Sequence, residues 1–371
     1  MFTSKFGNYS GMKIGLYSPF AANTLGGGER YLLTIAGCLL PEHQVDLVLS
    51  SFPVGLKSRL TKNFSLNLDG LNLVAGPFGP GHSAWERWRF TGQYDVFYYL
   101  TDGSFFVPHA KRNICHFMIP FNQPPRLVQK LKLNTWTVKT THSYFCQRAL
   151  EKIWKIKINF VQWGAVDAAQ FKPQIKQNLI INVGRWFTTK HNQHCKRQDF
   201  LAETFKKLCD QGLKNWRLAL IGPVEPGGEN LEYFKQVKKL SRGYPIDLLP
   251  QTDFKSLVKL YGRAKIYWHA TGYGTDELSN PQVSEHFGIS TIEAMAAGAV
   301  PVVINQGGQP EIVKPATDGY LWQNQIELID QTLALINNEA LRLKLSRGAQ
   351  NRAKDFSPEK FCQMTHKIFN L

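Results

Sequence analysis

Short apolar segments separated by helix-like stretches restrict the fold of this 371-residue chain more than any other feature. Six lie in the first 140 residues, at 12–18, 45–49, 71–74, 95–100, 113–117 and 134–140, and five in the second half, at 179–183, 217–221, 246–249, 265–270 and 300–304. Most are continuously apolar rather than alternating, which is typical of strands buried on both faces of a parallel sheet. The pattern therefore predicts an α/β fold with parallel sheets and right-handed crossovers.

The length of the chain favours two domains of about 150 to 200 residues over one core. We expect the boundary between residues 160 and 172, and we place the first domain at 1–163 and the second at 164–356. A last helix at 357–371 opens with Ser-Pro-Glu, a favourable helix start. Further helices are expected at 30–40, 144–154, 324–337 and 339–355.

The composition predicts a cytoplasmic protein. No stretch reaches the roughly 18 apolar residues of a membrane span, and residues 1–11 lack the apolar segment of a signal peptide. The six cysteines are scattered without a C-x-x-C pair, at Cys38, Cys115, Cys146, Cys195, Cys209 and Cys362. This spacing argues against a zinc site and predicts reduced thiols rather than disulfides.

The net charge is +16, and residues 1–160 carry most of it, with 18 Lys and Arg against 8 Asp and Glu. The positive electrostatic potential of this excess favours binding to nucleic acid, to an acidic acceptor or to the anionic face of a membrane. The basic residues are dispersed and no recognition motif is present, which argues against nucleic acid. Peripheral contact with the inner face of a membrane stays open. Trp85 and Trp88, with arginines beside them, fit either an interfacial patch or, as we expect, burial in the core.

Residues 284–298 form the stretch with the strongest functional pattern. Ser290 is predicted to cap a short helix at 292–297, and Gly298 to end it before the next strand. The unpaired amides at such a helix start suit a phosphate, and Glu285 just outside can accept hydrogen bonds from hydroxyl groups. A phosphorylated sugar fits both features. The alternative is a capping box between Ser290 and Glu293, with Glu285 as a solvated loop residue.

Glu285 and Glu293, together with Phe287, Gly288 and residues 294–298, resemble the E-x7-E signature of the retaining nucleotide-sugar glycosyltransferases of family 4. The resemblance implies the GT-B fold, two Rossmann-like parallel α/β domains facing across a cleft, with the last helix crossing back to the first domain. It assigns the donor sugar to Glu285 and the nucleotide ribose to Glu293, in a donor-binding loop that includes Phe287, Gly288, Ile289 and Ser290. On this assignment, Glu285→Ala would abolish transfer with little change in folding, and Glu293→Ala would weaken nucleotide binding.

Two elements of the first domain also match that family in pattern. Gly26, Gly27 and Gly28 follow the first strand and open a helix, where bare backbone can approach a ligand closely. The family places such a loop near the donor diphosphate and the acceptor. His116 ends a predicted strand, and the family often carries a histidine there, close to the reacting sugar. The alternative interpretation is that His116 is a structural residue held by hydrogen bonds.

Two basic residues near the first strand of the second domain complete the predicted site. Arg185 follows that strand directly and Lys196 comes eleven residues later, just before a helix. In the family, an arginine and a lysine at these places clamp the leaving diphosphate. The intervening segment is longer than in many members, so Lys190 or Arg197 could take the place of Lys196.

The resemblance implies retaining transfer from a UDP-, GDP- or ADP-sugar to an acceptor hydroxyl on a glycan, polysaccharide or lipid-linked substrate, with an α-linked product. No Asp-x-Asp occurs in the sequence, and two cations can hold the diphosphate, so we expect neither a metal nor another cofactor. Two alternatives remain open: a non-catalytic GT-B binding or assembly subunit, and a nucleotide-sugar hydrolase or epimerase on the same fold.

Overall fold

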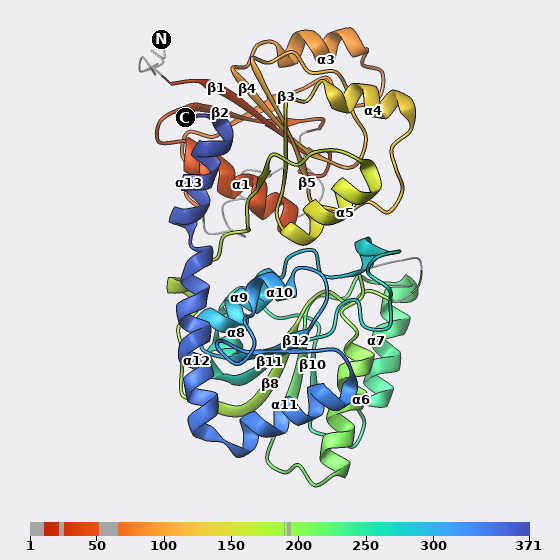
Figure 1. Ribbon diagram of the computed structural model, residues 1–371, viewed down its shortest axis with the longest axis vertical. Helices are drawn as coiled ribbons and strands as arrows, with labels where there is room; N and C mark the ends of the chain where they lie inside the picture. Colours follow the sequence, from red (N-terminus) through yellow and green to blue (C-terminus); the bar gives the residue numbers. More distant parts are fainter. Residues whose placement is uncertain (1–10, 22–25, 52–65, 189, 191–193) are drawn as a thin grey trace. The chain divides into compact units, whose positions relative to one another are not determined.

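The computed structural model describes residues 11–21, 26–51, 66–188, 190 and 194–371 (Figure 1). The chain divides into two compact units. Unit 1 comprises residues 1–142, 150–165 and 358–371, and unit 2 comprises 143–149 and 166–357. The main boundary thus lies at 165/166, where the sequence placed it at 163/164, and the last helix belongs to unit 1.

Unit 1 contains a parallel sheet of seven strands in the order β3-β2-β1-β4-β5-β6-β7. Its strands are β1 (Lys13–Tyr17), β2 (Gln44–Leu49), β3 (Asn72–Ala75), β4 (Val96–Thr101), β5 (Arg112–Phe117), β6 (Val138–Thr141) and β7 (Phe160–Val161). Its helices are α1 (Gly27–Leu39), α3 (Ala84–Thr91), α4 (Leu127–Asn134), α5 (Tyr144–Trp154), which the unit boundary divides, and α13 (Pro358–Phe369). The strand predicted at 134–140 starts too early, because α4 occupies the chain up to Asn134.

Two apolar clusters cover the faces of this sheet. On one face, α1 and α13 contribute buried residues such as Leu32, Ile35 and Ile368. The other face is rich in aromatic rings and includes Leu133 of α4 and Trp154 of α5. The sheet is therefore buried on both sides, as its continuously apolar strands predicted.

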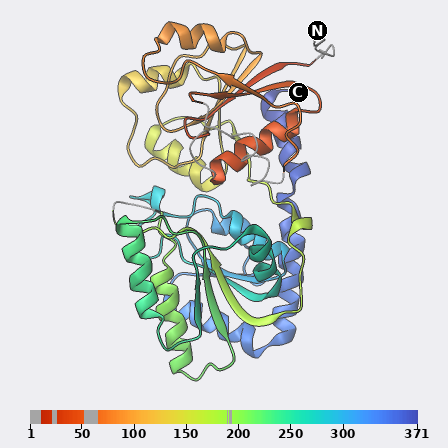
Figure 2. The same ribbon diagram turned by 180° about the vertical axis from the view of Figure 1, so that it is seen from behind.

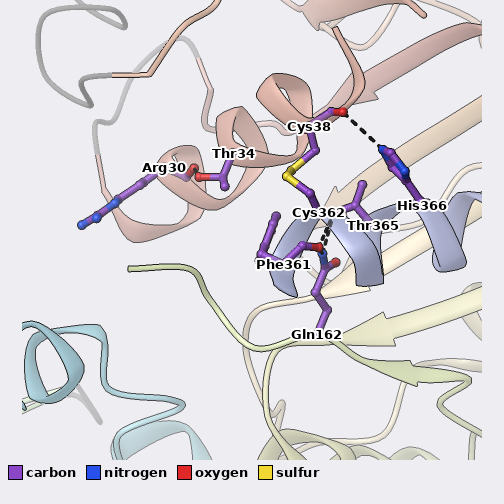
Figure 3. Close-up of a disulfide and its surroundings, with 8 residues drawn as sticks. All are labelled: Arg30, Thr34, Cys38, Gln162, Phe361, Cys362, Thr365 and His366. Carbon is purple, nitrogen blue, oxygen red and sulfur yellow. Dashed lines mark hydrogen bonds between the residues drawn. A yellow bond between two sulfur atoms is a disulfide. The ribbon is translucent and has the colours of Figure 1, made fainter. Parts of the chain in front are cut away.

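A disulfide between Cys38 on α1 and Cys362 on α13 joins the last helix to unit 1 (Figure 3). Gln162 donates hydrogen bonds from Nε2 to Phe361 O at 3.0 Å and to Thr365 Oγ1 at 2.7 Å. The prediction of reduced thiols is wrong for this pair. Cys38 and Cys362 are 324 residues apart, and only the pairing of two distant helices brings them together.

Unit 2 contains a parallel sheet of six strands in the order β10-β9-β8-β11-β12-β13. Figure 2 shows the same ribbon from behind. Its strands are β8 (Gln177–Val183), β9 (Arg217–Ile221), β10 (Ile246–Leu249), β11 (Ala264–His269), β12 (Val300–Ile304) and β13 (Tyr320–Trp322). Its helices are α6 (Gln198–Asp210), α7 (Gly228–Leu240), α8 (Phe254–Arg263), α9 (Ile289–Ala296), α10 (Gln309–Ile312), α11 (Gln325–Asn337) and α12 (Glu339–Ala353). Trp268, Val302 and Trp322 lie in its core.

Among the helices that the structure describes, none has both the length and the apolar character needed to cross a bilayer.

Candidate active site

Helix α9 starts at the place where the sequence predicted a ligand. Its N-cap is Gly288, with φ of 122°, and Gly298 follows its end with φ of 75°. Ser290 therefore lies in the first turn, where its Oγ is 2.8 Å from the Tyr267 hydroxyl. The predicted Ser290 cap and the alternative capping box are both wrong, and the Glu293 carboxylate instead accepts a hydrogen bond from Tyr261 at 3.0 Å.

Glu285 is buried, with 9% of its surface exposed, so it is not a solvated loop residue. Its Oε2 accepts hydrogen bonds from Lys196 Nζ and from His269 Nε2, each at 2.7 Å. Lys196 precedes Arg197, the N-cap of α6, and His269 is the last residue of β11. The carboxyl end of this sheet thus brings together residues that are far apart in the chain, as the general rule for ligand sites in parallel α/β folds expects.

The electrostatics of this cluster favour an ionised carboxylate. Burial raises the pKa of Glu285, but the Lys196 charge, His194 and the hydrogen bond from His269 outweigh it and hold the pKa well below its usual value. Burial lowers the pKa of His269, which keeps its imidazole neutral near pH 7. A neutral His269 that donates from Nε2 leaves Nδ1 as the acceptor, and Nδ1 is buried with no partner in the described part of the chain.

The three cations predicted for the diphosphate have different partners: Lys196 contacts Glu285, whereas Lys190 and Arg197 do not, and their role in binding a diphosphate stays a prediction. Lys190 pairs with Glu229 at 3.2 Å, and Arg197 pairs with Asp199 at 3.1 Å. The side chain of Lys196 is 13% exposed, so its charge is held mainly by protein groups.

Arg185 is exposed at the end of β8, and its guanidinium lies over the Phe187 ring at 5.0 Å. The residue before it, Gly184, lies against the Lys196 stem, because a Cβ at Gly184 would be 2.6 Å from Lys196 Cγ. Arg185 also lines a cavity of about 370 Å³ with residues 183–184, 221–223, 250–252 and Leu257. A basic group beside a cavity at strand ends suits an anionic ligand.

A glycine pair behind Glu285 fixes its backbone. Gly307 has φ of 64°, and a Cβ there would lie 2.2 Å from Glu285 O. Gly308 donates its backbone N–H to the same carbonyl at 2.7 Å. The loop after β12 therefore positions Glu285 by close backbone contact that a side chain would prevent.

The predicted site residues of unit 1 differ in accessibility. Gly27 and Gly28 begin α1 after Gly26, and a Cβ at either Gly27 or Gly28 would meet no atom of the described residues within 4 Å. His116 is fully buried, with Nδ1 at 2.8 Å from Thr140 Oγ1 and its ring stacked on Tyr31 at 4.6 Å. These contacts match the structural alternative for His116, and its catalytic role stays a prediction.

His269 and His194 also lie in the cluster around Glu285, and neither was predicted from the sequence as a site residue. His194 Nε2 lies 3.8 Å from Glu285 Oε1, and its ring stacks on His286 at 4.8 Å. Like His116, His269 lies at the end of an apolar strand, so the same sequence pattern could have identified it. His194 carries no comparable local signal in the sequence, since it does not lie at the end of a predicted strand.

The family model described as Glycosyl transferases group 1 matches residues 166–352, half of the chain. An uncharacterized glycosyltransferase of Methanocaldococcus jannaschii is 25% identical over 303 residues, covering 71% of this chain and 83% of that protein. The Xenopus laevis GDP-Man:Man(3)GlcNAc(2)-PP-Dol alpha-1,2-mannosyltransferase is 27% identical over 205 residues, covering 53% of this chain and 39% of that protein.

Solved glycosyltransferase structures show the same fold. One from Rickettsia africae aligns with a TM-score of 0.75 and 15% identity over 98% of both chains. Anabaena HepE in complex with UDP and glucose aligns with a TM-score of 0.69 and 16% identity over 96% of this chain and 98% of its own. The fold is thus GT-B, and the chain belongs to the glycosyl transferases group 1 family and is a glycosyltransferase.

Proposed function

We propose that the protein is a retaining family 4 enzyme that transfers a sugar from a nucleotide diphosphate sugar to an acceptor hydroxyl, forming an α-linkage without a metal ion. The observation that carries the proposal is the cluster of Lys196, His269 and Glu285 beside the start of α9. It combines a cation for a diphosphate with an ionised carboxylate for sugar hydroxyls, and Arg185 directly follows Gly184, which lies against the Lys196 stem.

Charge separation explains why these groups would promote transfer. Breaking the bond between the sugar and the diphosphate develops positive charge at the anomeric carbon and negative charge on the leaving group. Lys196 and Arg185, together with the amides at the start of α9, supply preplaced positive charge for the leaving group. By analogy with oxyanion holes, each such donor contributes about a hundred- to a thousandfold in rate. Metal independence is proposed because these cations are available and the sequence has no Asp-x-Asp.

The relatives suggest which substrates to test first. One is named for GDP-mannose and a dolichol-linked oligosaccharide, and HepE was solved with UDP-glucose. We therefore propose a GDP- or UDP-sugar as donor and a glycan or lipid-linked acceptor. The basic first half of the chain favours an acceptor with anionic groups.

A nucleotide screen tests the donor. Melting temperature and calorimetric binding are measured with UDP, GDP, ADP and their sugar conjugates, with and without Mg²⁺. Ligand at a hundredfold excess over its Kd stabilises the folded state by about 2.7 kcal/mol, so a true donor gives a clear shift. We expect one nucleotide to shift the melting temperature equally with and without the metal. No shift for any nucleotide would contradict the proposal and favour a non-catalytic subunit.

A matched pair of lysine variants tests the site itself. Lys196→Gln should weaken binding of the nucleotide diphosphate and lower transfer by about a hundredfold. Lys190→Gln, which removes a lysine paired with exposed Glu229, should leave both unchanged. Sugar release without any acceptor, at the rate seen with acceptor, would identify a hydrolase instead.

A further inference from the structure

Helix α4 of unit 1 exposes an apolar face although the rest of the helix is well anchored. Leu127, Val128 and Leu131 are 74%, 62% and 60% exposed. On the opposite side, Leu133 is fully buried in the aromatic cluster and Gln129 accepts the Phe105 backbone N–H at 2.9 Å. The exposed leucines and valine thus do not result from a loosely attached helix.

The positions around the helix axis explain the pattern. At about 100° per residue, Leu127, Leu131 and Val128 form one continuous strip, and Gln129 and Leu133 lie on the other side. Lys130 borders the strip on one flank and Lys132 on the other. An apolar strip between lysines is the arrangement of helices that lie in the interface of a membrane, where the apolar groups enter the acyl boundary and the cations remain at the headgroups.

The charge of the surrounding sequence also favours contact with a membrane interface. Residues 103–150 contain seven basic residues and no Asp or Glu: Lys111, Arg112, Arg126, Lys130, Lys132, Lys139 and Arg148. The Arg126 and Lys130 side chains are exposed beside the strip. A surface of this sign attracts anionic headgroups. It would repel a second copy of itself in a two-fold dimer, where like surfaces meet.

Helix α3 adds a second exposed apolar group on the same face of the sheet. Phe90 of α3 packs against the aromatic cluster that contains Leu133 of α4, so both helices cover this face. Trp85 at the start of α3 is 63% exposed and stacks on Trp88 at 4.9 Å. The expected burial of both tryptophans is therefore wrong for Trp85. A tryptophan with arginines nearby in sequence suits the headgroup region of a bilayer.

We propose that the exposed strip of α4, with Trp85 of α3, docks the protein on an anionic lipid bilayer. The strip enters the interface while Arg126, Lys130 and Lys132 contact anionic headgroups. This surface lies outside the cluster around Glu285, so docking does not depend on the proposed transfer reaction.

Vesicle sedimentation of the full chain tests the proposal. The protein is mixed with vesicles of phosphatidylcholine alone or with 30% phosphatidylglycerol, at low and high salt. We expect binding to the anionic vesicles, weaker binding at high salt, and little binding to neutral vesicles. A triple variant, Leu127→Ser with Val128→Ser and Leu131→Ser, should reduce binding by about tenfold or more, since the three side chains provide the inserted apolar surface.

A control variant replaces three exposed apolar residues of unit 2: Ile175→Ser, Leu278→Ser and Ile326→Ser, at side chains that are 92%, 66% and 71% exposed. It should bind vesicles like the unchanged protein, and both variants should keep its melting temperature because the replaced groups are exposed. Equal vesicle binding by the α4 variant, or no binding by the unchanged protein, would overturn the proposal. A dimer in solution that the α4 variant disrupts, without vesicle binding, would assign the strip to self-association instead. Donor binding, measured separately, tests the transfer reaction without reference to lipid.

Discussion

Lys196 and Glu285 form an ion pair of 2.7 Å in which both side chains are almost fully buried. They lie 89 residues apart in the chain, on the segments that lead into α6 and α9. Removal of one partner leaves a buried charge without compensation, which typically destabilises a protein by about 3–5 kcal/mol. Glu285→Ala should therefore lower stability as well as transfer, in contrast to the little change in folding that the sequence led us to expect.

Glu285→Gln keeps the shape of the side chain and an oxygen that can accept from Lys196, so it should cost less stability than Glu285→Ala, although Lys196 still loses its charged partner. We expect transfer to fall by about a hundredfold or more while the fold is retained. Asp247→Asn, at the exposed pair between Arg217 and Asp247, should cost less than about 1 kcal/mol. Chemical denaturation and donor turnover check all three variants. Full transfer by Glu285→Gln would defeat the assignment of Glu285.

Gly308→Ala should displace Glu285 without altering any polar group of the site. Its φ of −82° suits any residue, but a Cβ would lie 2.7 Å from Phe287 Cα and 2.8 Å from His286 O. The backbone must shift, at a cost of about 1–3 kcal/mol. Denaturant unfolding and calorimetric donor binding should both show the loss, and unchanged binding would show that this contact does not position Glu285.

Gly28→Ala provides the opposite case, since a Cβ there meets nothing within 4 Å in the part of the chain that the structure describes. Alanine within a helix should raise stability by about 0.5–1 kcal/mol. If substrate approaches this bare backbone as proposed, kcat/KM should nevertheless fall. A variant that is more stable and equally active would remove Gly28 from the substrate site.

Reduction of the disulfide between Cys38 and Cys362 should destabilise unit 1. The bridge closes a loop of more than 300 residues, which corresponds to about 5–6 kcal/mol in the chain-entropy model. Melting with and without a thiol reductant measures the effect. The double variant Cys38→Ala with Cys362→Ala should melt like the reduced protein and show no response to reductant, whereas a response would point to another bridge.

Stability should fall as the pH drops below about 6.5. Burial holds the pKa of His116 well below its usual value, with a further decrease from nearby His142. The unfolded chain then binds a proton near pH 6.5 that the folded chain does not, so folding loses up to about 1.4 kcal/mol per pH unit for this residue until the folded pKa is reached. His116→Phe keeps an aromatic ring between Tyr31 and Tyr98 and should flatten this slope. An unchanged slope in denaturation between pH 5 and 6.5 would contradict the assignment.

Local patterns predicted individual elements of this fold well. Helix α5 and strand β12 have the predicted bounds, and Gly298 follows the end of α9 as expected, because strand and helix periodicity and glycine conformation act over a few residues. The stretch around Glu285 also indicated a ligand site from short-range features. The predicted N-cap of α9, Ser290, lies two residues after the observed N-cap, Gly288. The Ser290 hydroxyl instead contacts the Tyr267 hydroxyl.

Only the tertiary structure decided which distant groups meet. The pairing of Lys196 rather than Lys190 with Glu285, the addition of His269, the bridge from Cys38 to Cys362 and the exposure of Leu127 all depend on strand order and helix packing. The sequence by itself determined two parallel α/β domains and the stretch where donor chemistry is expected. Partners across a sheet are chosen by packing over the whole chain, a long-range property that the spacing of residues along the sequence does not contain.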